Sequence, residues 1–235
     1  MKSIRASIGL LLMTATSMAV GYSQTGPSEP AASASGGRSL RASDASLPKD
    51  VYPDSRNRLP SIKREELDEL GKKVFDTAGG SGASTGATGI RIYSPPLADS
   101  MVKARDWLKA AIDPRLVELA ILVATREMDG KFEWNIHEPL ALKAGLEPEI
   151  ITVIKHRQPL KGLAEKDAVI IQLGREMFRN HKVSSDTYAR ALKLNGKQGL
   201  VNVVSLMCHV AGTNLLENAF DQQLPPGQKQ LLPIP

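Results

Sequence analysis

Apolar side chains recur every three or four residues along most of the chain, the spacing that places them on one face of an α-helix. The clearest stretches cover residues 132–144, 165–180 and 199–220, and residues 115–128 are apolar at nearly every position. No stretch shows the sustained alternation of apolar and polar residues that is typical of a strand. The pattern therefore predicts an all-α protein, a helical bundle of about seven or eight helices.

Residues that favour helix ends divide this pattern into elements. Ser61 is a candidate N-cap for a helix from residue 62, in which Leu67, Leu70, Val74 and Phe75 have helical spacing, and Ser184 for one near the C-terminal end. Asp113 followed by proline is expected to open a helix over residues 115–128 that is apolar on every side and therefore buried. Asp129-Gly130 is expected to end that helix, and Gly145 the next one.

The N-terminal part of the chain differs from the rest. Residues 1–23 run from positive through apolar to small side chains, which is typical of a secretory signal peptide. A membrane anchor is the alternative, but the apolar run is short for a span. Residues 24–46 are rich in Ser, Ala, Gly and Pro, which predicts a disordered linker, and residues 47–235 form the helical domain. We also expect a flexible loop at 79–89.

Composition and charge narrow the classes of function. The chain is 42% hydrophobic and 23% charged, as expected for a protein with a core, and only 4% aromatic. Its formal net charge is +5, but no run of Lys and Arg is interleaved with aromatic residues, so we expect no nucleic-acid partner. With the signal removed, we expect an exported protein, periplasmic or secreted, with no stable membrane insertion.

The chain has one cysteine, Cys208, so it cannot form an internal disulfide. We expect this thiol to be a small buried apolar side chain rather than a reactive group. The adjacent His209 makes a poor partner for a shared metal ion, since neighbours on a helix point about 100° apart. His156, His181 and His209 are expected to be structural or exposed.

Three polar residues interrupt the apolar pattern where chemistry would need them. Glu118 lies inside the most apolar helix, and a carboxylate there is protonated, paired or catalytic. Glu133 and His137 are four residues apart on one helix face, and a carboxylate beside an imidazole can act as an acid–base pair. Pairing of Glu118 with Arg115 or Arg126, an ordinary surface pair at 133 and 137, and a metal site are the alternatives.

The stretch from Glu118 to Gly145 resembles the core motif of the carboxymuconolactone decarboxylase and alkylhydroperoxidase D superfamily. That motif has a Glu, eleven residues, Cys-x-x-Cys, three residues and a His. Here Glu118 and His137 match, whereas Gly130 and Glu133 stand at the two cysteine positions. The string Phe-Glu-Trp-Asn-Ile-His at 132–137 is similar to a thiol-free branch labelled carboxymuconolactone decarboxylase-like, and the resemblance covers about residues 59–220.

The resemblance implies a cofactor-free carboxy-lyase acting on a small lactone or unsaturated carboxylic acid, with Glu118, Glu133 and His137 as catalytic residues. Arg126 and Lys131 are nearby charges that could meet such an acid, but both are expected at the surface. The family's alkylhydroperoxidase or peroxiredoxin-type antioxidant activity is one alternative, although a lone cysteine lacks a resolving partner. A non-catalytic helical binding module is another. The resemblance also implies a homo-oligomer, a trimer or hexamer.

Overall fold

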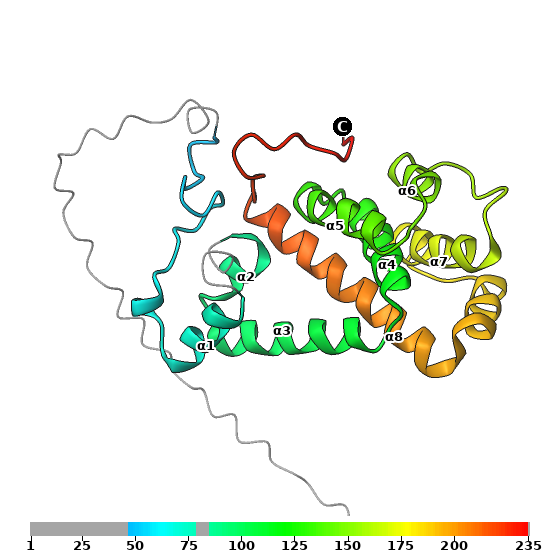
Figure 1. Cartoon of the computed structure of the whole chain (residues 1–235), viewed down its shortest axis with the longest axis horizontal. Coiled ribbons are helices and arrows are strands. Elements are labelled where there is room, and N and C mark those ends of the chain that lie inside the picture. The colour runs from blue at the N-terminus through cyan, green and yellow to red at the C-terminus, as the bar shows by residue number, and fades with distance from the viewer. Residues whose placement is uncertain (1–46, 79–84, 235) are drawn as a thin grey trace, which may run out of the picture. The chain divides into compact units, whose positions relative to one another are not determined.

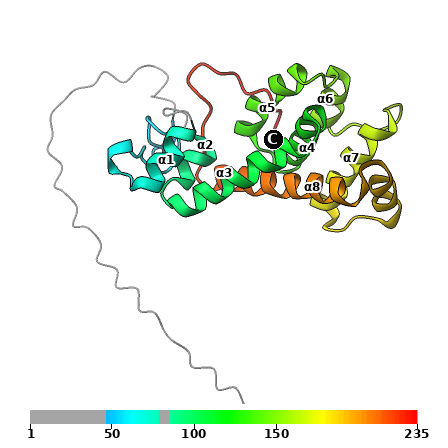
Figure 2. The ribbon, with the colours of Figure 1, turned by 60° about the horizontal axis from the view of Figure 1, so that its bottom comes forward.

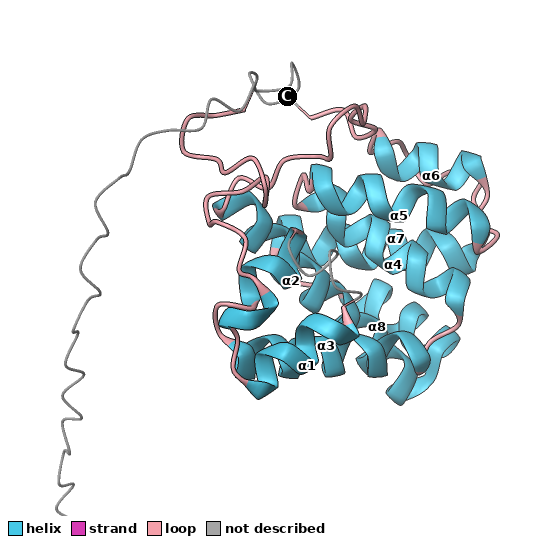
Figure 3. Ribbon diagram, turned by 60° about the vertical axis from the view of Figure 1, so that its left-hand side comes forward, coloured by secondary structure: helices cyan, strands magenta, loops and turns pink. Residues whose placement is uncertain are grey.

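The computed structural model describes residues 47–78 and 85–234, which all belong to one compact unit. The signal peptide expected at 1–23 and the linker expected at 24–46 lie outside these residues. Within the described ranges every regular element is helical, and no strand is present (Figure 3). The predicted all-α fold is therefore confirmed.

Eight α-helices make up the described chain, in the order labelled in Figure 1. A short 3₁₀ turn, η1 (Arg64–Glu66), precedes the first helix, and a π-helical turn, η3 (Glu176–Asn180), extends the seventh. The helices are α1 (Glu69–Thr77), α2 (Gly86–Arg91), α3 (Pro95–Ala110), α4 (Pro114–Glu127), α5 (Lys131–Lys143), α6 (Pro148–Lys155), α7 (Glu165–Arg175) and α8 (Ser185–Ala219).

Helix α4 is the centre of the fold. It begins as predicted at Asp113, whose carboxylate accepts hydrogen bonds from the backbone N–H groups of Arg115 and Leu116. Every residue from Val117 to Arg126 is buried, because α5, α7 and α8 all pack against this helix. Helix α8 contacts α3 as well as α4, and Figure 2 shows α3 running alongside α8.

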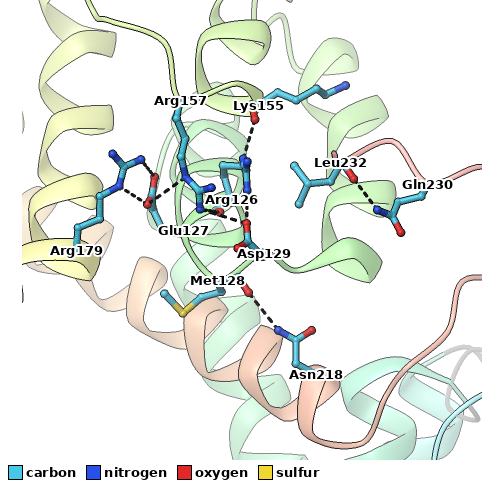
Figure 4. Close-up of polar contacts among 10 residues, drawn as sticks. All are labelled: Arg126, Glu127, Met128, Asp129, Lys155, Arg157, Arg179, Asn218, Gln230 and Leu232. Carbon is cyan, nitrogen blue, oxygen red and sulfur yellow. Dashed lines mark hydrogen bonds and ion pairs between the residues drawn. The ribbon is translucent and has the colours of Figure 1, made fainter. Parts of the chain in front are cut away.

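The turn between α4 and α5 is held by a network of polar contacts (Figure 4). Arg126 donates to the carbonyl oxygen of Lys155 at 2.7 Å and pairs with Asp129, which also accepts from Arg157 at 3.1 Å. Asn218 of α8 donates to the carbonyl oxygen of Met128 at 3.1 Å. These contacts fix the direction in which α5 leaves α4, and so the relative positions of their side chains.

Two local predictions near the N-terminus were wrong in part. Ser61 is followed only by the 3₁₀ turn η1, and the α-helix expected from there begins at Glu69, where Asp68 accepts from the backbone N–H of Gly71 at 2.7 Å. The loop expected at 79–89 contains the start of α2 at Gly86. That helix begins at a backbone φ of +63°, and the side chain of Gln222 accepts the N–H of Gly86 at 2.9 Å.

Helix α8 is long because two predicted helices are continuous with each other across a bend. Ser184 caps its start, as predicted, and Gly196 forms the bend with φ of 66° and ψ of 176°, angles available mainly to glycine. By length and apolar composition α8 alone among the described helices could cross a membrane, but half of that apolar window is buried inside the fold. Such burial is typical of a core helix.

Candidate functional site

The three predicted site residues meet inside the helical core. Nδ1 of His137 lies 2.7 Å from Oε2 of Glu118, and Nε2 of the same ring lies 3.4 Å from Oε2 of Glu133. The side chains of Glu118, Glu133 and His137 are 10%, 15% and 8% exposed. The imidazole is therefore held between two nearly buried carboxyl groups, one at each ring nitrogen.

The local sequence explains this geometry. The spacing of four residues brings Glu133 and His137 to one face of α5. Between them, Trp134 is fully buried and donates its indole N–H to Glu138, which anchors the helix and fixes its rotation. Glu118 points from α4 toward that face, where the hydrogen bond to Nδ1 fixes the orientation of the ring.

The protonation of His137 and Glu133 depends on their burial and on their contact with each other. Burial alone would lower the pKa of His137, but its hydrogen bonds to Glu118 and Glu133 outweigh burial and raise it. Burial alone would raise the pKa of Glu133, but the hydrogen bond to His137 and the charge of that ring outweigh burial and lower it. The imidazolium and the carboxylate therefore stabilise each other.

A third carboxyl group, Glu217 of α8, lies beside Glu133. Burial, followed by the negative charge of Glu133, raises the pKa of Glu217 to about 10, so this side chain is protonated at neutral pH. Its Oε1 accepts the backbone N–H of Ala87 at 3.0 Å. Its Oε2 has no hydrogen-bonding partner that meets ordinary geometry among the described residues. Glu217 thus holds a proton directly behind Glu133.

A cavity of about 320 Å³ opens beside this group of residues. Its volume is at the lower end of the range for small-molecule sites, about 300–1,000 Å³. Glu133 and His137 line it, whereas Glu118 lies behind the imidazole and outside the lining. Ile136 and Leu140 line it too and are 41% and 40% exposed, so the cavity reaches solvent beside α5. The rest of the lining comes mainly from α2, α3 and α8.

Models of known protein families, curated proteins and solved structures were compared with the chain, and none matches it. The assignment of a function to this cavity therefore depends on its own chemistry.

Two of the alternatives considered for these residues are wrong. Arg115 pairs with Asp167 at 2.7 Å and Arg126 with Asp129, so neither arginine neutralises Glu118. The pair of Glu133 and His137 is not at the surface. Arg126 was expected at the surface, but it is buried, because it fixes the α4–α5 turn.

The expectation that Cys208 is buried was also wrong. Its side chain is exposed on α8 and does not line the cavity, because α8 buries its other faces against α3 and α4. The described residues contain no group of three His, Cys, Asp or Glu side chains placed to hold a metal ion.

Gly130, at the start of α5, is in contact with Asn214 of α8. A Cβ atom at position 130 would lie 1.5 Å from Oδ1 of Asn214. The Asn214 amide is held in place by bonds to the carbonyl oxygen of Val210 at 2.8 Å and the hydroxyl of Thr125 at 3.3 Å. The space that a side chain at 130 would need is therefore occupied.

Sequence reasoning missed several residues of the site. Glu217 could have been found from the sequence, because, like Glu118, it is a carboxyl group within an apolar helix. His209 was set aside as structural or exposed, yet it lines the cavity. The cations Arg91, Arg105 and Lys109 also line it, and they come from segments whose approach to α5 depends on tertiary packing.

Proposed function

We propose that this protein is a cofactor-free enzyme that transfers a proton on a small lactone or unsaturated carboxylic acid, as a carboxymuconolactone decarboxylase-like carboxy-lyase. One observation carries the proposal: His137 stands in the wall of a small cavity with a carboxyl group at each ring nitrogen. Such an imidazole is oriented, kept basic and shielded from bulk water, as general acid–base catalysis requires.

In the proposed reaction a carbon–carbon bond of the substrate carboxylate breaks and carbon dioxide leaves. The bonding electron pair stays on the substrate, delocalised into a conjugated carbonyl group as an enolate. The imidazolium of His137 then gives its Nε2 proton to the carbon, and water restores the proton to the ring. Glu118 stabilises the imidazolium through Nδ1, and Glu133 either orients Nε2 or takes part in the proton transfer itself.

Peroxide reduction by a thiol pair is the weaker alternative. Glu133 occupies one position of the superfamily's cysteine pair, and at the other Asn214 fills the space beside Gly130. The only thiol in the sequence, Cys208, is exposed and outside the cavity. A peroxidase would have to use Cys208 alone, so loss of hydroperoxide consumption in Cys208→Ser is the result that would favour it.

The test is turnover of a panel of small lactone and unsaturated carboxylic acids. Carbon dioxide release and deuterium incorporation from heavy water report bond cleavage and proton transfer separately. We expect His137→Ala to lower turnover by roughly 10²–10⁴-fold, the usual contribution of a general acid or base. His156→Ala is the matched control, because His156 is an exposed histidine at the end of α6.

Full turnover by a folded His137→Ala protein would reject the mechanism. Absence of turnover by the wild type on every acid in the panel would favour the third possibility, a non-catalytic helical binding module. In that case Glu118→Gln and His137→Ala would change the free energy of unfolding alone.

A further inference from the structure

The walls that α2, α3 and α8 contribute to the cavity carry several basic side chains. Arg91 ends α2, Arg105 and Lys109 lie one turn apart on α3, and His209 lies on α8. None of these side chains takes part in the hydrogen bonds that hold His137. The acid–base pair leaves them unexplained, although they line the same cavity.

Two of these cations have no carboxylate partner. Within the described residues, neither Arg91 nor Lys109 has an acidic side chain within ion-pairing distance, 4.0 Å, and Arg91 donates only to the hydroxyl of Thr213, at 3.0 Å. Arg105 differs, because it pairs with its neighbour Asp106 at 2.8 Å. Arg91 is half-buried, and burial lowers its pKa, so this charge is solvated poorly by water and by protein.

The acids of the site balance this charge only in part. The negative charge of Glu133 acts on both Arg91 and Lys109, but Glu133 is also hydrogen-bonded to His137, and Glu217 is protonated. His209 reports the resulting potential: after burial, the charges of Arg91 and Arg105 lower its pKa most. The cavity therefore has positive charge on one side, a property that attracts an anionic ligand.

The donors available favour a carboxylate over a phosphate group. Phosphate sites commonly use free backbone N–H groups at a helix N-terminus. Here the first N–H groups of α2 are taken, since Gly86 donates to Gln222 and Ala87 to Glu217. What remains is a guanidinium fork and a single ammonium group, enough for one planar carboxylate.

We propose that Arg91 and Lys109 bind the carboxylate of a small organic acid, whose apolar carbon skeleton lies against Ile136 and Leu140. This subsite rests on the proposed function for its meaning as a substrate site, since it would place an atom of the same acid near Nε2 of His137. The binding itself does not need turnover, so the subsite is tested without it.

The probe is hexanoate, and its uncharged analogue hexanamide has the same skeleton without the charge. Titration calorimetry is expected to show hexanoate binding and much weaker binding of hexanamide. Arg91→Met and Lys109→Gln are each expected to weaken hexanoate binding roughly tenfold to hundredfold, the usual loss for one charged hydrogen-bonding group. Lys103→Gln is the matched control, because Lys103 lies on α3 but pairs with Asp99 outside the cavity.

Three results would overturn the subsite: equal binding of hexanoate and hexanamide, tighter binding of inorganic phosphate than of hexanoate, or unchanged hexanoate binding in both cavity variants. If Arg91→Met fails to fold, Lys109→Gln decides, since the Lys109 side chain makes no hydrogen bond or ion pair among the described residues and its loss leaves no partner unpaired. Arg91→Met and Lys109→Gln report on the subsite through hexanoate binding, whereas His137→Ala reports on catalysis through turnover, so a failure of catalysis and a failure of the subsite are distinguishable.

Discussion

At the scale of single residues, Glu217 is the most unusual group in the molecule. Its folded-state pKa of about 10 is far above the unfolded value of about 4.3, so the folded protein holds a proton that the unfolded chain releases. Across that range the free energy of unfolding falls as pH rises, by up to about 1.4 kcal/mol per pH unit from this group. Below pH 4 the group contributes no such loss.

Glu217→Gln is therefore expected to be more stable than the wild type at pH 8 and nearly equal to it at pH 4. The amide oxygen can still accept from Ala87, and the amide cannot ionise. Urea unfolding of both proteins at the two pH values is the measurement. A stability difference that does not change with pH would contradict the raised pKa, and Glu149→Gln on the exposed start of α6 serves as the control.

How far the site could be predicted depends on where each residue stands in the sequence. Glu118 could be recognised because the apolar residues around it bury it, and the spacing of Glu133 and His137 fixes their common face on α5. The contact between Glu118 on α4 and His137 on α5 depends on tertiary structure, because the turn fixed by Arg126 and Asp129 sets how the two helices lie. No local pattern reports it, although the family resemblance placed the three residues in one motif.

At the scale of elements, the contact between the start of α5 and α8 offers a sharp test. Gly130→Ala is expected to lower the free energy of unfolding by about 1–3 kcal/mol, the usual cost of overpacking, because the new methyl group meets Asn214. Asn214→Ala makes room for it. Gly130→Ala should therefore cost much less in the Asn214→Ala background, and urea unfolding of the four proteins gives the coupling energy.

Additive effects of the two substitutions would contradict the close contact. Strong coupling would show that Asn214 excludes a side chain at position 130. A cysteine there would need Asn214 to move or change, so building a thiol pair into this chain requires more than substitutions at 130 and 133.

The helices that sequence reasoning found are those with strong local determinants. α4 has an Asp-Pro start and a continuous apolar sequence, and α8 has its Ser184 cap. α2 was missed because its sequence is glycine-rich and short, and its first N–H groups are satisfied from a distance, by Glu217 and Gln222. The stability of such a helix comes from tertiary hydrogen bonds, which no local pattern contains.

At the scale of the whole molecule, the expected homo-oligomer remains a prediction, and α8 provides a surface on which to test it. Val201, Cys208 and Leu215 are seven residues apart and therefore share one side of the helix. Val201 is 63% exposed and Leu215 is 57% exposed, although both side chains are large and apolar. Association of this face with another subunit would remove it from water.

We therefore expect the wild-type protein to have a mass that is a multiple of the subunit mass in light scattering after size exclusion, and Leu215→Lys to have the mass of one subunit. A charged side chain at this position can stay solvated in a single chain but not in an apolar interface. Leu194→Lys is the matched control, because Leu194 is 46% exposed on the same helix but lies before the bend at Gly196. A wild-type protein with the mass of one subunit, or assembly unchanged by Leu215→Lys, would exclude this face as the interface.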